Sequence, residues 1–151
     1  MTTLPAVRAW PAFWLGLMAL VALAAVPRLL TYDYGLPYIE YIDEVQLYWY
    51  AQAARGLSDA KLSNLSGYPP AYIQLHVLTQ QLLESLGYTG PAVVIQTLRL
   101  AAVVANLVGV VLVALAARML AGPAAGLVAA AVWALSPLVI EWSVLAIGES
   151  L

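Results

Sequence analysis

The sequence predicts an all-α integral membrane protein with three transmembrane helices and amphipathic interfacial helices in its first outer loop. Of its 151 residues, 64% are hydrophobic and only 9% are charged, and the mean hydropathy is +0.87. An ordinary soluble domain carries roughly 25% charged residues. Long charge-free stretches alternate with one segment that is rich in tyrosine. These observations together indicate a chain whose solvent is largely lipid.

The composition also excludes several classes of protein. A soluble domain of about 150 residues leaves roughly a third of its chain surface exposed, which is too much for so apolar a sequence. The same hydrophobicity excludes intrinsic disorder. The net charge is -2 and the six basic residues are scattered singly, so no cationic surface for nucleic acid is expected. Without cysteine, the chain has no disulfide, thiolate nucleophile or cysteine-based metal site.

Three charge-free stretches are the predicted transmembrane helices, because about 20 apolar residues in a helix cross the roughly 30 Å hydrocarbon core. They run from Ala9 to Pro27, from Leu100 to Ala117 and from Met119 to Ile140. The chain is thereby divided into an N-terminal segment with the first transmembrane helix (1–30), an outer loop (31–98), a second transmembrane helix (99–120), a third (121–145) and the start of a second outer loop (146–151).

The second and third stretches are predicted to form an antiparallel hairpin. Gly122 and Pro123 lie at the start of the third stretch, where glycine ends one helix and proline begins the next. The many alanines and glycines on both sides would let the two backbones approach closely in lipid. The first stretch has a second interpretation as a secretory signal peptide, since Arg8 precedes a short apolar region and the tripeptide at 22–24 fits a cleavage site.

The outer loop contains all nine tyrosines, a concentration typical of a surface at the lipid headgroups. Within it, the segment DEVQLYWYAQAAR predicts a short helix that begins with Asp43 and Glu44 and stops before Gly56. Helical spacing predicts one shared face for this segment, made of Val45, Tyr48, Trp49 and Gln52.

A second helix is predicted in the outer loop from Ala71 to Gly87. It is too short and too polar to cross lipid unaided, so we expect an amphipathic helix in the interface or a re-entrant segment. Pro69 and Pro70 fix an extended backbone before its first turn. Its expected apolar contacts are Ile73, Val77 and Leu78.

The distribution of charge predicts the orientation of the chain. With three crossings, all eight acidic residues fall on one side of the membrane. The other side has Arg8 and Arg118 and no acid, which suits a cytoplasmic face. We therefore expect the chain in the plasma (inner) membrane with its N-terminus in the cytoplasm and the outer loop on the external side.

In its order of motifs the sequence resembles the start of the GT-C superfamily of membrane glycosyltransferases. The motifs are YIDEVQLYWYAQAARG, GYPPAYIQLHVL, TLRLAAVVANLVGVVLVALAARMLAG and AAAVWALSPLVIEWSVLAIGESL. The closest likeness is to the protein O-mannosyltransferase and aminoarabinose-transferase branch. Family members are several times longer, so the resemblance implies that this chain corresponds to their N-terminal portion and transfers a sugar from a polyprenyl-phosphate donor to an acceptor hydroxyl on the outer face.

The resemblance implies that Asp43 and Glu44 are catalytic. A carboxylate within hydrogen-bond reach of the acceptor hydroxyl can take its proton and stabilise positive charge on the sugar ring. Asp43 is the expected base. Glu44 would orient it or join Glu149 in holding a divalent metal ion, since hard cations take carboxylate oxygens. Without the resemblance, an acidic pair at this place is a solvated helix start.

The donor phosphate is expected to bind cationic and hydrogen-bonding groups at the outer interface. The predicted substrate-binding residues are Arg99, Arg55, Lys61 and Tyr68.

An alternative function of a different class is also consistent with the sequence. If these residues are the whole protein, three helices cannot enclose both a lipid-phosphate groove and an acceptor site. The chain would then be a non-catalytic accessory or structural subunit that packs against other membrane subunits as well as membrane lipid.

Overall fold

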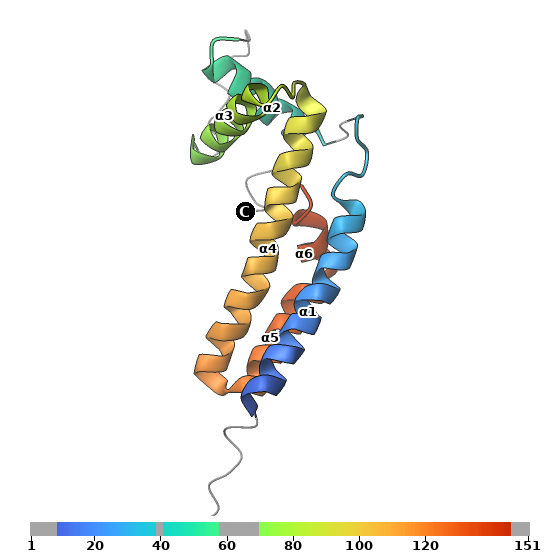
Figure 1. Cartoon of the computed structure of the whole chain (residues 1–151), viewed down its shortest axis with the longest axis vertical. Helices are drawn as coiled ribbons and strands as arrows, with labels where there is room; N and C mark the ends of the chain where they lie inside the picture. Colours follow the sequence, from blue (N-terminus) through green and yellow to red (C-terminus); the bar gives the residue numbers. More distant parts are fainter. Residues whose placement is uncertain (1–8, 39–40, 58–69, 146–151) are drawn as a thin grey trace, which may run out of the picture.

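The computed structural model describes residues 9–38, 41–57 and 70–145, and the regular structure in these ranges is entirely helical (Figure 1). The helices are α1 (Ala9–Thr31), α2 (Ile42–Ala54), α3 (Pro70–Ser85), α4 (Pro91–Ala121), α5 (Pro123–Leu135) and α6 (Pro137–Trp142). Helices α1, α4 and α5 run side by side as a long bundle, with α6 continuing α5. Helices α2 and α3 form a small second layer at one end of α4 (Figure 1).

Two of the described helices are long and apolar enough to cross a membrane. They are α1, over Pro11–Thr31, and α4, over its whole length. This finding confirms the predicted all-helical class and two of its long apolar helices. Helix α4 begins at Pro91, eight positions before the predicted start at 99, because proline favours the first turn of a helix and Gly90 precedes it.

The third charge-free stretch forms two helices instead of one continuous helix. Helix α5 ends at Leu135, and Ser136 has an extended backbone with φ -63° and ψ 120°. Pro137 then begins the short helix α6. Proline lacks an N–H and disfavours helical geometry in the residue before it, so the helix breaks at this place. The prediction of a single helix over 121–145 did not allow for this break.

The helix ends predicted from glycine and proline are present in the structure. Gly122, with φ +88°, ends α4, and Pro123 occupies the first turn of α5. Gly56, with φ +73°, follows α2. Positive φ is strained for residues with a Cβ, which explains glycine at both ends. Helix α3 begins at Pro70, one residue before the predicted start.

The bundle is held by close contact between α4 and α5. A Cβ added to Gly126 would lie 2.6 Å from the carbonyl oxygen of Ala114, so only glycine fits there. On α1, Phe13 is buried and lies under the guanidinium of Arg118, 4.3 Å from the ring centre. The hydrophobic cluster at the centre of the bundle contains Phe13, Leu17, Ala24, Val110, Ala114, Ala130 and Ala134.

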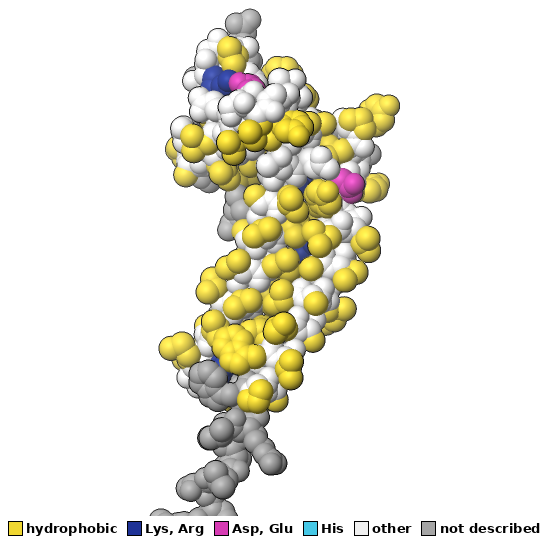
Figure 2. Space-filling view, in the orientation of Figure 1, with side chains coloured by type: hydrophobic (Ala, Val, Ile, Leu, Met, Phe, Trp, Pro, Cys, Tyr) yellow, Lys and Arg dark blue, Asp and Glu magenta, His cyan; other side chains and the backbone are white. Residues whose placement is uncertain are grey.

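The outside of the bundle also carries many exposed apolar side chains. Figure 2 shows hydrophobic side chains over the visible face of the long helices, with few charged groups between them. Leu15 and Met18 of α1, Leu112 of α4 and Val132 of α5 are each at least 60% exposed. Soluble monomers rarely expose continuous apolar surfaces of this extent.

Candidate functional site

A buried ion pair joins α4 to α2 at the end of the bundle. Arg99 donates from Nε to one carboxylate oxygen of Glu44 at 2.8 Å and from Nη2 to the other at 2.6 Å. The side chains are 2% and 0% exposed. Two parallel hydrogen bonds between opposite charges are the strong geometry for arginine and carboxylate. This pair therefore fixes the start of α2 against α4.

Arg99 also holds the chain that connects α1 to α2. Its Nη1 donates to the backbone carbonyl oxygens of Tyr32 at 3.2 Å and Tyr34 at 2.7 Å. A single side chain thus joins the segment after α1, the first turn of α2 and the N-terminal part of α4. The sequence offered Arg99 as a substrate ligand, and the structure gives it four hydrogen bonds within the protein.

Asp43 lies beside Glu44 in the first turn of α2, and its side chain is exposed. The two acidic side chains point in different directions, because consecutive residues of a helix differ by about 100° around its axis. The residues of α2 that are buried are Glu44, Leu47, Tyr48 and Ala51. Of the residues predicted to share one face, Tyr48 is buried, Val45 and Gln52 are half-buried, and Trp49 is 49% exposed.

A largely apolar cavity of about 470 Å³ lies at the same end of the bundle. Its polar lining residues include Tyr34, Tyr41, Arg99 and Glu141. Tyr41 directly precedes α2, so the cavity lies next to the element that carries the acidic pair. The rest of the lining comes from Thr31, Pro137, Ile140, Val144 and Leu145. An apolar cavity with a few polar groups suits an amphiphilic ligand.

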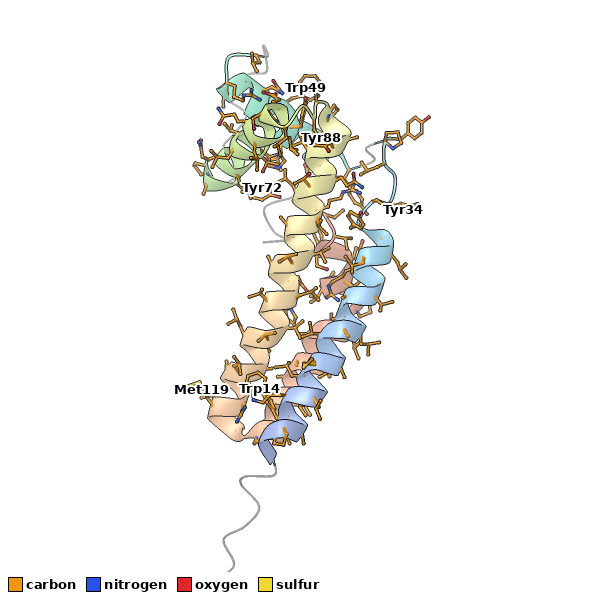
Figure 3. All side chains as sticks on the ribbon, viewed as in Figure 1. Trp14, Tyr34, Trp49, Tyr72, Tyr88 and Met119 are labelled. Carbon is orange, nitrogen blue, oxygen red and sulfur yellow. The ribbon has the colours of Figure 1, made fainter. Side chains whose placement is uncertain are left out.

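Aromatic side chains mark the two ends of the molecule. In Figure 3, Tyr34, Trp49, Tyr72 and Tyr88 lie around the α2–α3 end, whereas Trp14 lies at the opposite end of the bundle. Tyrosine and tryptophan are enriched where a protein meets lipid headgroups. Of these side chains, Tyr72 is buried in the protein and the others are exposed.

Arg55 has a partner on α3. It forms an ion pair with Glu84, and its Nη1 also donates to Oε1 of Gln80 at 3.1 Å. The hydrogen bond from Arg55 lowers the pKa of Glu84, and the same bond raises the pKa of Arg55. Arg55, which was predicted to bind substrate, therefore joins α2 to α3 in the structure. Lys61, Tyr68 and Glu149 lie outside the described residues.

The described residues do not assemble a metal site. Within residues 9–38, 41–57 and 70–145, no group of three or more His, Asp or Glu side chains could hold a metal ion. Both oxygens of Glu44 accept hydrogen bonds from Arg99, so a divalent ion would have to displace that guanidinium.

A second buried arginine was not singled out from the sequence. Arg28, near the end of α1, is 0% exposed and donates from Nε to Oγ of Ser143 at 2.9 Å. Its Nη1 donates to the carbonyl oxygens of Ala24 at 2.8 Å and Ala134 at 3.1 Å. Ala134 lies in the last turn of α5, just before the break at Pro137. A basic residue at the end of an apolar stretch was the only signal for this contact.

No protein family matches the chain, and comparisons with curated proteins and with solved structures find no significant similarity.

Proposed function

We propose that the chain is an integral membrane protein in which α1, α4 and the α5–α6 pair each cross the bilayer. The length and apolar character of α1 and α4 support the first two crossings. The third would be made by α5 and α6 together, with their break covered by Arg28. A broken helix at membrane depth is tolerated when neighbouring groups satisfy the freed backbone, and Arg28 bonds a carbonyl of α5.

For its activity, we propose a membrane glycosyltransferase that moves a sugar from a polyprenyl-phosphate donor to an acceptor hydroxyl on the outer face. In this reaction the hydroxyl oxygen attacks the anomeric carbon and the bond from that carbon to the phosphate oxygen breaks. The lipid phosphate leaves with the bonding electrons, and the hydroxyl proton passes to Asp43. A carboxylate placed there also stabilises the positive charge that develops on the sugar ring.

The observation that carries this proposal is the arrangement of the acidic pair. Glu44 is buried and held by Arg99, whereas its neighbour Asp43 is exposed at the same end of the bundle as the apolar cavity. The fixed Glu44 would hold its neighbour Asp43, the proposed base, in a constant position. A base needs such positioning because small displacements of a catalytic group cost much of its effect. The cavity has the apolar lining that a polyprenyl chain would fit.

The proposal gives Arg99 a different role from the one first expected. Its charge is neutralised by Glu44, so a donor phosphate would compete with a buried carboxylate for it. A positioning role agrees better with its four hydrogen bonds. Arg55 is likewise paired, with Glu84.

The test is a transfer assay in membranes that contain the full-length protein, with a radiolabelled polyprenyl-phosphate sugar and an added hydroxyl acceptor. Asp43→Asn keeps the size of the side chain and removes its ability to take a proton. We expect transfer to fall by about 10²–10⁴-fold, the usual range for a general base. Asp33→Asn, another exposed acid in the outer segment, is the matched control and should transfer sugar at the parental rate. Transfer by Asp43→Asn within a few-fold of the parent would remove Asp43 from the mechanism.

A further inference from the structure

Helix α3 has one buried face, and its exposed surface is divided into an apolar and a polar edge. The buried residues are Tyr72, Ile73, His76, Val77 and Gln80. Of the apolar contacts expected from the sequence, Ile73 and Val77 therefore pack inside the protein. Leu78 and Leu82 are 54% and 61% exposed, and Leu86 in the turn after the helix is 63% exposed. Their spacing of four places these leucines in one row. We refer to this row as the leucine edge.

The polar edge of α3 lies on the other side of its exposed surface. It contains Gln81 and Ser85, both exposed. Glu84, which pairs with Arg55, is two positions from Leu82, and two positions in a helix differ by about 200°. The leucine edge and the ion pair therefore face nearly opposite directions.

The position of α3 along α4 places it near the boundary of a bilayer. Helix α4 has 31 residues and is about 46 Å long, which exceeds the roughly 30 Å of the hydrocarbon core. Its charge-free part, from Leu100 to Ala117, is about 27 Å long. Helix α3 packs on α4 before that part, where Leu83 contacts the cluster of Val94 and Leu98.

The space-filling view agrees with this placement. Figure 2 shows hydrophobic side chains along the side of the α2–α3 layer that faces the long bundle, and a pair of opposite charges at its far end. A helix at a bilayer boundary would have this orientation, with apolar groups toward the acyl chains and charges toward water.

We propose that the leucine edge inserts into the boundary between headgroups and acyl chains of the bilayer that α4 crosses, so that phospholipid is its binding partner. This contact would anchor the α2–α3 layer and hold the acidic end of α2 at a constant depth. The inference rests on the membrane crossing proposed for α4 and is independent of sugar transfer. Lipid is favoured over a protein partner because α3 packs on α4 at Val94 and Leu98, directly before the apolar stretch that begins at Leu100.

The experiment uses the absence of cysteine from the chain. Single variants Leu82→Cys, Gln81→Cys and Val108→Cys of the chain are labelled with the environment-sensitive fluorophore NBD. They are reconstituted into vesicles of phosphatidylcholine and phosphatidylglycerol. Fluorescence is then quenched with aqueous iodide, with a lipid that carries a spin label near its headgroup, or with one labelled deep in the acyl chain. Gln81, which is about 100° from Leu82 around the helix, is the matched control on the polar edge, and Val108 reports the crossing of α4.

We expect the shallow lipid quencher to act several-fold more strongly at position 82 than at position 81, and iodide to act in the reverse order. Position 108 should respond to the deep lipid quencher. If 108 responds so but iodide quenches 82 as strongly as 81, the leucine edge faces water and the inference is wrong. Protection of 82 from all three quenchers would mean that protein covers it, which also overturns the inference. If neither lipid quencher acts at position 108, α4 does not cross the bilayer and the premise of the inference is wrong.

Discussion

Arg99 of α4 and Glu44 of α2 form a bidentate ion pair that water does not reach, although the two residues are 55 positions apart in the chain. Their contact determines where α2 begins, which of its residues are buried, and how the segment after α1 is held. The exposed Asp43 is positioned through this contact.

Removing one partner of the pair is expected to cost far more stability than removing both. Glu44→Gln leaves the guanidinium of Arg99 buried without a counter-charge, which typically costs about 3–5 kcal/mol. The double variant Glu44→Leu with Arg99→Met replaces the pair by apolar groups of similar size. Its free energy of unfolding should lie within about 1–2 kcal/mol of the parental value. Denaturant unfolding in detergent, followed by circular dichroism, measures both. Equal losses in the single and double variants would contradict this account.

The pair is also expected to affect catalysis through Asp43. Arg99→Lys keeps the charge but cannot make two parallel bonds to Glu44 while holding the carbonyls of Tyr32 and Tyr34. We expect a lower transfer rate with unchanged binding of the donor, since the proposed role is to position the base. Rate and donor affinity, measured separately over a range of donor concentrations, distinguish this role from direct phosphate binding, which would weaken donor affinity instead.

The contact between α4 and α5 is expected to reject a methyl group at one glycine and accept it at another. In Gly126→Ala the new Cβ would lie 2.6 Å from a backbone oxygen of α4, so the helices must separate, at a cost of about 1–3 kcal/mol. In Gly109→Ala the nearest atom is Nε1 of Trp133, at an ordinary 3.6 Å. The second variant should match the parent or exceed it, since alanine favours helix. Thermal unfolding of the two variants compares them directly, and equal stability would argue against close packing at Gly126.

The ion pair of α2 and α3 predicts a pH dependence. The hydrogen bond from Arg55, followed by the attraction between their charges, lowers the pKa of Glu84. A carboxyl group with a lowered pKa contributes stability above its unfolded pKa of about 4.3 and loses it as the pH falls through the folded value. A carbon NMR titration should find Glu84 below that ordinary value, and Arg55→Met should return it there. Because Glu84 is exposed, the effect of the pair on the free energy of unfolding should be small. An unchanged titration in the variant would mean that the pair does not form in solution.

The orientation of the chain can be tested with the same cysteine-free background. A cysteine in place of Ala121, beside the hairpin, should be protected from a membrane-impermeant maleimide in intact cells. A cysteine in place of Ser85 at the end of α3 should be labelled, because the two positions lie at opposite ends of α4. Both residues are exposed in the structure, so burial within the protein does not explain a difference. Labelling of both positions in intact cells would contradict the proposed crossing.

The sequence by itself determined the features that depend on neighbouring residues. Hydropathy located the long apolar helices α1 and α4, because the tendency to leave water is a property of each stretch alone. Glycine and proline predicted the turn at Gly122 and Pro123 and the end of α2 near Gly56, because the backbone preferences of these residues are local. The break at Pro137 is equally local, but the single third helix was predicted from the absence of charge in its stretch alone.

Only the tertiary structure decided which polar groups meet. Arg99 and Glu44 were both recognised from the sequence, yet one was assigned to a phosphate and the other to a metal or to its neighbour. Their mutual contact depends on how α2 packs against α4, and no local pattern encodes a contact between side chains so far apart in the chain. The same packing buried Ile73 and left the leucine edge exposed. Helical periodicity gives the residues that share a face, but the choice of the face that is buried follows from the free energy of pairing a buried charge and covering apolar surface across the whole fold.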